Sequence, residues 1–173
     1  MNDPGAATPS FPTAIVEDEV LAEYGVIILQ VHHSAQIALE LGRPSAGRLL
    51  HAGRGGATLR SGGFDHWAHV RLELWPSQPS GPPDPQAWDG REEGELNVDA
   101  TELRLASATA GVSERPLRLP APGRYRIRAH SAGGHTVRDH FTAADHGVPG
   151  FPRGLERWLL QLWPSKIHAS GAR

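Results

Sequence analysis

The segment His66–Ser77, with the sequence HWAHVRLELWPS, decides the fold of this chain. Residues of two kinds alternate along it. Small or aliphatic residues occupy one face, namely Ala68, Val70, Leu72 and Leu74, and polar residues and tryptophans occupy the other, namely Trp67, His69, Arg71, Glu73 and Trp75. A period of two is typical of a β-strand with one face in the core and one face outside. Pro76 ends the pattern because proline has no N–H to donate to a neighbouring strand. The segment therefore predicts a half-buried strand that stops at Pro76.

The last six residues of this segment occur again near the end of the chain. Leu-x-Leu-Trp-Pro-Ser stands at Leu72–Ser77 and at Leu160–Ser165. We interpret each copy as the end of a strand whose leucines fill the core and whose tryptophan covers the sheet edge from the outer face. The residues upstream, HVR in one copy and RWL in the other, do not match. The repeat therefore predicts two similar strand endings rather than a duplicated domain.

Further short apolar runs along the chain also predict strands. We expect a strand buried on both faces at 25–31, and half-buried strands or strand fragments at 37–41, around Leu49, and at 58–59, 96–98, 103–105, 117–119, 125–129 and 158–162. The stretch AIVEDEVLAEYG at 14–25 allows either a short helix or a strand. Residues 131–154 are predicted to form a loop. Glycine and proline turns separate the strands.

Many short strands with almost no helical periodicity predict an all-β protein. We expect a two-sheet β-sandwich, jelly-roll-like or a related barrel, with about eight to nine strands. Little helix is expected, and only in the N-terminal third. One domain is predicted to span residues 14–165, between a flexible tail at 1–13 and a second tail at 166–173. The 173 residues are enough to bury one such core.

The composition narrows the classes of function. The chain has 17 basic and 19 acidic residues and a formal net charge of -2, so no overall field attracts it to nucleic acid or to an anionic membrane. It has no cysteine, which excludes disulfides, thiolate metal sites and a cysteine nucleophile. The first residues, MNDPGAATPSFPT, have neither the basic start nor the apolar stretch of a secretion signal. We expect a soluble, cytoplasmic protein that does not enter membranes.

The segment 130–146 is the best candidate for a metal site. It carries residue types that bind zinc or iron, namely His130, His135, His140, His146, Asp139 and Asp145. The spacing contains no His-x-His or His-Glu-x-x-His pattern, and a loop does not by itself bring side chains together. No Gly-x-Ser-x-Gly elbow is present either. We therefore expect no metal and no other cofactor, with a metal-dependent or small-ligand enzyme that uses this segment as the alternative.

Tryptophans and arginines on the outer strand faces are the candidate binding residues. They are Trp67, Trp75, Arg124, Arg126, Arg128 and Trp163. Three arginines at alternate positions point the same way and could hold phosphate or an acidic partner. The competing interpretation is that they pair across the sheet with Glu73, Glu95 or Glu102, as charged strand residues commonly do. Trp88 is expected to anchor its proline-rich loop onto the sandwich.

Three segments resemble a family of small actinobacterial β-sandwich proteins. They are the strand end, loop and tryptophan of Trp75–Trp88, the strand PAPGRYRIRAH at 120–130, and RWLLQLWPS at 157–165. More distantly, the strand order and LPAPGRYRIRAH are similar to the LPxGxYxL strand of the competence-associated inhibitor of the DNA-entry nuclease. That family is β-rich and binds and blocks a nuclease. The resemblance covers about residues 25–165 and implies a fold and a protein partner, without assigning a role to individual residues.

These observations favour a non-enzymatic protein-binding β-sandwich, such as a nuclease or toxin inhibitor or an immunity-like protein. The alternative is the enzyme built on the His-rich segment 130–146. A nucleic-acid-binding module that uses the arginine strand is disfavoured by the charge balance. The oligomeric state is left open.

Overall fold

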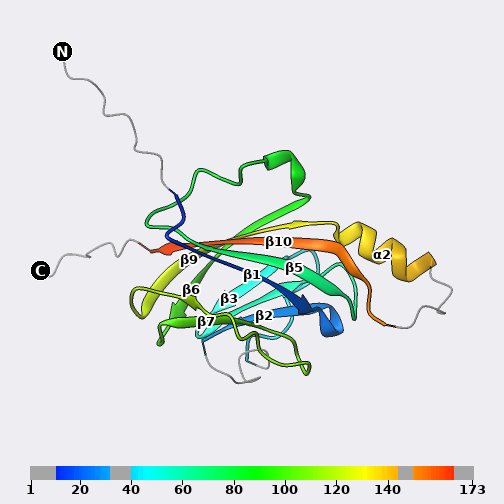
Figure 1. Ribbon diagram of the computed structural model, residues 1–173, viewed down its shortest axis with the longest axis horizontal. Helices are drawn as coiled ribbons and strands as arrows, with labels where there is room; N and C mark the ends of the chain where they lie inside the picture. Colours follow the sequence, from blue (N-terminus) through cyan, green and yellow to red (C-terminus); the bar gives the residue numbers. More distant parts are fainter. Residues whose placement is uncertain (1–10, 32–39, 144–149, 166–173) are drawn as a thin grey trace, which may run out of the picture.

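The computed structural model describes residues 11–31, 40–143 and 150–165, in which ten strands form two sheets of five (Figure 1). The first sheet has the order β1 (Ala14–Leu21), β5 (Trp67–Leu74), β10 (Arg153–Pro164), β9 (Gly123–Ala132) and β6 (Gly90–Val98). The second sheet has the order β3 (Leu50–Gly53), β4 (Gly56–Arg60), β2 (Val26–Gln30), β7 (Glu102–Ala106) and β8 (Leu117–Arg118). The predicted all-β, two-sheet sandwich is confirmed.

The core lies between the two sheets and follows the predicted alternation. The first sheet contributes Ala68, Val70, Leu72, Leu96, Ile127, Trp158, Leu160 and Leu162, and the second contributes Ile27, Leu29, Leu59, Leu103, Leu105 and Leu117. The two leucines of the repeat, Leu72 and Leu160, are both fully buried. Removal of this apolar surface from water is the main stabilising contribution of the fold.

The two copies of Leu-x-Leu-Trp-Pro-Ser lie side by side. Strands β5 and β10 pair in parallel, with Leu160 opposite Leu72 and Leu162 opposite Leu74. Both strands are interior, because the ends of the first sheet are β1 and β6. The expectation that each tryptophan covers a sheet edge is therefore wrong. Trp163 is on the outer face of an interior strand, where the Arg128 guanidinium lies over its ring, and its side chain is buried.

The loop at 75–89, which contains the short helix η2 (Pro85–Ala87), lies over the outer face of the first sheet (Figure 1). Two arginines of the sheet bind its backbone: Arg128 Nη1 donates to the carbonyl of Pro79 at 3.0 Å, and Arg157 Nη2 donates to the carbonyl of Ala87 at 2.8 Å. Outer-face residues such as Glu73 and Gln161 are consequently buried. The middle of the first sheet therefore has little contact with water on either face.

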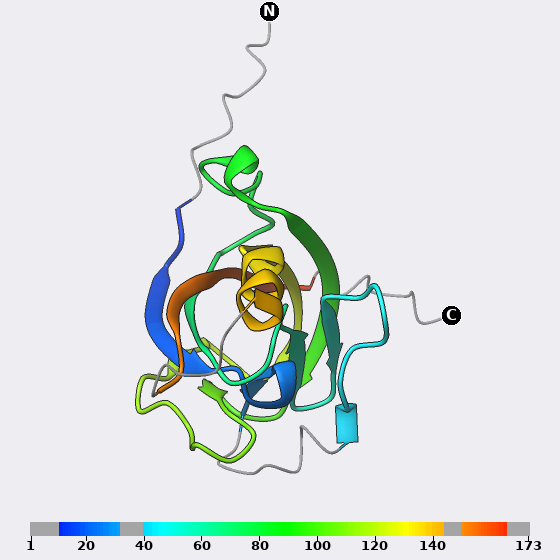
Figure 2. The same ribbon diagram turned by 90° about the vertical axis from the view of Figure 1, so that its right-hand side faces the viewer.

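One side of the sandwich is closed by contacts between β6 and β3. The Gly55 N–H donates to the carbonyl of Asn97 at 2.8 Å. Glu92 accepts hydrogen bonds from the backbone N–H groups of Leu49 and Leu50, at 2.6 and 3.1 Å. The strands consequently curve into the barrel-like cross-section seen in Figure 2.

Helix α2 (Gly134–Ala143) projects from one end of the sandwich (Figure 1) and is seen nearly end-on in Figure 2. The loop predicted at 131–154 is therefore wrong in part, and so is the restriction of helix to the N-terminal third. Only Val137 and Phe141 give this segment an apolar face, too short a pattern to reveal a helix. The helix approaches the β4–β5 connection so closely that a Cβ at Gly62 would lie 2.0 Å from the carbonyl oxygen of Gly134.

The undecided stretch 14–25 is a strand followed by the short helix η1 (Glu23–Gly25). Alternate residues of β1 face the core, which accounts for the mixed pattern. Residues 37–39 of the strand expected at 37–41 lie outside the described residues, and its last two residues, Glu40 and Leu41, are helical, so that part of the expectation is wrong. Within the part of the chain that the structure describes, no helix is long and apolar enough to cross a membrane.

Candidate protein-binding surface

The predicted binding residues fall into two groups at opposite ends of β5. Trp67 begins this strand and Trp75 follows its end, which separates them by roughly 26 Å at the usual rise of a strand. Trp75 lies beside β10, because its backbone N–H donates to the carbonyl of Leu162 at 2.7 Å. The remaining residues, Arg124, Arg126, Arg128 and Trp163, lie on the outer faces of β9 and β10 near that end. Five of the six are thus brought together, and Trp67 is not.

The arginines of β9 pair with glutamates of β6, as one of the two interpretations predicted. Arg124 lies 3.3 Å from Glu95, and Arg126 and Arg128 lie 3.2 and 2.7 Å from Glu93. Glu93 rather than Glu73 or Glu102 is therefore the main partner. Arg128 is only 3% exposed and stacks over the Trp163 ring at 5.2 Å, so neither residue is open to a protein that docks on the outer face.

Glu93 is the electrostatic centre of this face. Its partial burial raises the pKa of its carboxyl group, but the hydrogen bonds from Arg91, Arg128 and Arg126 outweigh burial and lower the pKa to about 2. The carboxylate thus remains charged well into the acid range and fixes three guanidinium groups. This arrangement orders the outer face around one carboxylate that three guanidinium groups share.

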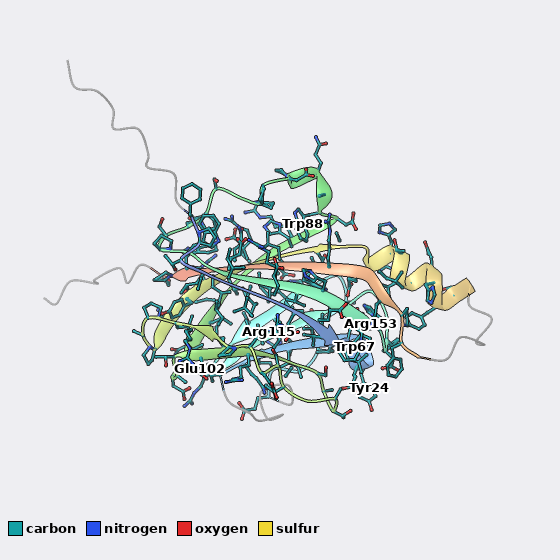
Figure 3. All side chains as sticks on the ribbon, viewed as in Figure 1. Tyr24, Trp67, Trp88, Glu102, Arg115 and Arg153 are labelled. Atoms are coloured by element: carbon teal, nitrogen blue, oxygen red, sulfur yellow. The ribbon has the colours of Figure 1, made fainter. Side chains whose placement is uncertain are left out.

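A second group of aromatic side chains lies at the other end of the sandwich, and we call it the aromatic end: Tyr24, Phe64, Trp67 and Phe151. Three of them are among the most exposed large apolar side chains, with Tyr24 65%, Phe64 52% and Phe151 51% exposed. Trp67 is half-buried. Figure 3 shows Tyr24 and Trp67 near one another at this end, with Arg153 beside the indole.

Backbone hydrogen bonds tie together the three segments that carry the aromatic end. The Asp65 N–H donates to the carbonyl of Ala22 at 2.9 Å, and the Ser61 N–H donates to the carbonyl of Gly25 at 3.0 Å. The Trp67 N–H donates to the carbonyl of Pro152 at 2.8 Å. The exposed rings are therefore mounted on a connected framework rather than on independent loops.

Tyr24 is held in an unusual conformation. Its φ of 54° and ψ of 21° place its backbone in the left-handed region, which residues other than glycine seldom adopt. The next residue, Gly25, also has a positive φ, and a Cβ there would lie 2.8 Å from Arg43 Nη2. The preceding residue, Glu23, accepts a hydrogen bond from the Ala110 N–H at 2.9 Å. The surrounding chain thus fixes a turn that presents the Tyr24 ring to solvent.

Two arginines accompany the rings. The Arg153 guanidinium lies 4.5 Å from the centre of the Trp67 ring and also pairs with Glu19. The Arg43 guanidinium lies 5.4 Å from the centre of the Phe64 ring. Tyrosine, tryptophan and arginine are the residues enriched where one protein binds another most strongly. The aromatic end therefore has the composition of a protein-binding surface.

Beneath this end lies a buried polar cluster of Ser61, His66 and Glu156. Glu156 Oε2 accepts a hydrogen bond from Ser61 Oγ at 2.7 Å and lies 3.2 Å from His66 Nε2, while Oε1 accepts from the Gly62 N–H at 2.8 Å. Burial raises the pKa of Glu156, but these hydrogen bonds outweigh it and lower the pKa below its usual value. A nucleophilic triad places the histidine between serine and carboxylate. Here the carboxylate contacts both partners, so the cluster cross-links β10 to the loop at 61–66.

The histidines of segment 130–146 are dispersed. His130 is buried in β9 beneath Trp88, with ring centres 5.8 Å apart, whereas His135 and His140 are exposed on α2. His146 lies outside the described residues. Within residues 11–31, 40–143 and 150–165, no group of three or more potential metal ligands occurs. That the protein binds no metal stays a prediction, to be tested by elemental analysis of untagged protein.

Tyr24, Phe64 and Phe151 were not predicted as site residues. Each is a single aromatic residue next to glycine in a connection, in Glu23-Tyr24-Gly25, Gly63-Phe64-Asp65 and Gly150-Phe151-Pro152. Such a residue belongs to no alternating apolar pattern, so the sequence does not indicate whether its side chain is buried or exposed. Isolated aromatics in glycine-bounded turns were the available signal, but their gathering at one end depends on the topology.

Two solved structures have a fold similar to that of this chain. No protein-family model and no curated protein matches the chain. The crystal structure of ComJ from Bacillus subtilis, described as an inhibitor of the DNA degrading activity of NucA, matches 92% of this chain and 100% of its own, with a TM-score of 0.50 and 11% identity. The structure of crocagin biosynthetic gene J matches 88% of this chain and 98% of its own, with a TM-score of 0.55 and 15% identity. The distant similarity to the competence-associated nuclease inhibitor, expected from the sequence, is thus confirmed at the level of the fold.

Proposed function

We propose that this chain is a non-enzymatic binding protein that inhibits a nuclease or toxin by docking its aromatic end onto that partner. The observation that carries the proposal is the presentation of three exposed aromatic rings by hydrogen-bonded segments. The fold shared with ComJ, a nuclease inhibitor, supports the class of partner. The role of the Ser61–His66–Glu156 cluster in this proposal is to stiffen the surface from below.

The rigidity of the aromatic end favours tight binding. Side chains that are already fixed before association lose less conformational entropy when the complex forms. Tyr24 is a clear case, because the surrounding chain holds it in a backbone conformation that only glycine adopts without strain. Strain of this kind concentrates at functional positions. Trp67 completes the surface, and it is the predicted binding residue that lies there.

The outer-face group is the competing surface. Arg124 and Arg126 are its most accessible members, and each already has a glutamate partner. Exposed ion pairs of this kind contribute about 0 to 1 kcal/mol. Arg128 and Trp163 are buried, which leaves little of either side chain for a docked protein to contact. We therefore assign the outer-face group a secondary role in binding.

The test is inhibition of DNA degradation by a panel of purified nucleases that includes NucA and any nuclease or toxin encoded beside this chain. Tyr24→Ala combined with Phe64→Ala removes two rings of the aromatic end. Phe11→Ala is the matched control, because Phe11 is 71% exposed and precedes β1 at the opposite end. Arg124→Ala combined with Arg126→Ala tests the competing surface.

We expect the aromatic-end variant to inhibit at least tenfold less strongly, with Phe11→Ala within twofold of the parent. Loss of inhibition in the arginine variant alone would move the docking site to the outer face. Absence of binding to every member of the panel, with a folded protein, would contradict the proposed function itself.

A further inference from the structure

A pocket of about 280 Å³ lies between the loop at 75–89 and the first sheet, apart from the aromatic end. Its principal lining residues are Pro82, Pro85, Trp88, Arg91, Arg128 and His130. Figure 3 shows Trp88 in the loop above the sheet. The volume is at the lower limit for small-molecule sites and matches a ligand with one ring.

The walls of the pocket are fixed by the sheet. The rings of Trp88 and His130 have centres 5.8 Å apart and are tilted by 50°. The Arg157 guanidinium lies 4.9 Å from the centre of the Trp88 ring and also binds the carbonyl of Ala87. Arg128 binds the carbonyl of Pro79 at the other end of the loop. Because the loop is held at both ends, the pocket exists before a ligand arrives.

The charges around the pocket favour an anion. Glu93 is the shared carboxylate partner of Arg91, Arg126 and Arg128, which leaves an excess of positive charge. Two of these arginines line the pocket. The acidic residue Asp89 lines it as well, but its carboxylate accepts a hydrogen bond from the Gly133 N–H at 2.7 Å. An anionic group beside Arg91 and Arg128 would meet guanidinium donors suited to a carboxylate.

His130 adds unused hydrogen-bonding capacity. The residue is 3% exposed, and neither its Nε2 nor Gln161 Oε1 has a hydrogen-bond partner at bonding distance. Burial lowers the pKa of His130, and the charges of Arg128 and Arg91 lower it further, whereas the Gln161 side chain acts in the opposite direction. The lowered pKa favours the neutral imidazole, which carries one N–H donor.

We propose that this pocket binds a small carboxylate attached to a planar aromatic body. The aromatic body lies against Trp88 and the two prolines, and the carboxylate accepts hydrogen bonds from the side of Arg91, Arg128 and His130. This site is independent of the proposed docking of a nuclease at the aromatic end.

Benzoate is the probe, and uncharged benzamide is the control of the same shape. Binding is followed by NMR through the indole N–H signal of Trp88 and the ring signals of His130. Arg91→Gln removes one guanidinium, and Arg118→Gln is the matched control, because Arg118 is an exposed, glutamate-paired arginine of the second sheet. Trp88→Leu removes the aromatic wall.

We expect benzoate to bind at least tenfold more tightly than benzamide. Arg91→Gln should weaken benzoate at least fivefold without weakening benzamide, and Arg118→Gln should change neither. Bound benzoate should also raise the pKa of His130, because a nearby anion favours the imidazolium. Equal binding of benzoate and benzamide, or equal effects of the two arginine variants, would overturn the proposal.

A second pair of probes distinguishes two possible ligands, a free aromatic acid and the C-terminal carboxylate of a peptide. A short peptide that ends in phenylalanine with a free carboxylate is compared with the same peptide amidated. Tighter binding of the free-carboxylate peptide than of benzoate would identify a chain terminus as the ligand, and the reverse order would identify a free aromatic acid. Weaker binding of benzoate to Trp88→Leu than to the parent protein is expected for both sources, and unchanged binding counts against the site.

Discussion

Tyr24 combines an exposed aromatic ring with a left-handed backbone, two features that stability alone disfavours. The ring leaves apolar surface in water, and the backbone of a residue with a Cβ is strained at a φ of 54°. A glycine would adopt the same conformation without that strain. This combination is the reason why we propose that the Tyr24 ring makes contacts outside this chain.

Tyr24→Gly should leave the free energy of unfolding unchanged or raise it by up to about 1 kcal/mol, because relief of strain offsets the greater freedom of glycine in the unfolded chain. The same variant should inhibit the partner nuclease less well. Urea denaturation together with the inhibition assay measures both effects. Clear destabilisation by Tyr24→Gly would show that the ring supports the fold instead.

The ion pairs of Glu93 make the free energy of unfolding depend on pH in the acid range. The pKa of Glu93 is lowered to about 2, so the carboxylate stabilises the folded state above the ordinary glutamate pKa. This contribution is lost as the pH falls from about 4.5 to 2, and amounts to roughly 2 to 3 kcal/mol. Glu93→Gln should therefore be less stable than the parent at pH 7, and the two should converge near pH 2.

Denaturation of both proteins across this pH range is the measurement, with Glu114→Gln as an exposed control. A difference between Glu93→Gln and the parent that stays constant with pH would show that the ion pairs contribute little.

At the scale of the elements, the central pair β5 and β10 organises the first sheet. Leu72→Ala and Leu160→Ala should each lower the free energy of unfolding by about 2 to 5 kcal/mol, because each leaves a cavity in the core. The two leucines are opposite one another, so the double variant should differ from the sum of the single effects by at least about 0.5 kcal/mol.

Ile15→Ala serves as the control for the leucine variants, because Ile15 is 46% exposed on β1. Its effect should stay within about 0.5 kcal/mol. Chemical denaturation of these four variants and the parent protein is the measurement. Additive leucine effects would argue against direct contact between the two copies of the repeat.

The alternation of apolar residues was sufficient to predict most strands and the faces they bury. It could not reveal that the two copies of the repeat pair in parallel, because strand neighbours depend on contacts between distant segments. Helix α2 escaped prediction because two apolar residues, Val137 and Phe141, establish no period. The aromatic end escaped because Tyr24 and Phe64 lie in turns, whose arrangement depends on the whole fold.

At the scale of the whole molecule, β10 joins parts of the fold that are far apart in sequence. It pairs with β5 on one side and β9 on the other, and it carries Trp158, Leu160 and Leu162 into the core. A chain truncated after residue 150 should therefore fail to fold, whereas one truncated after residue 165 should stay folded. Circular dichroism and the dispersion of NMR signals distinguish these outcomes. A folded chain without β10 would contradict the central role of this strand.

The central position of β10 has a consequence during synthesis. The ribosome synthesises β5 and β9 before β10, and the two strands cannot complete their sheet until the strand between them emerges. Their apolar faces and unpaired backbone groups stay accessible during that interval, when nascent chains are prone to aggregate. Folding of this domain is thus expected to follow translation rather than accompany it, which makes the nascent chain a natural client for chaperones that shield exposed strands.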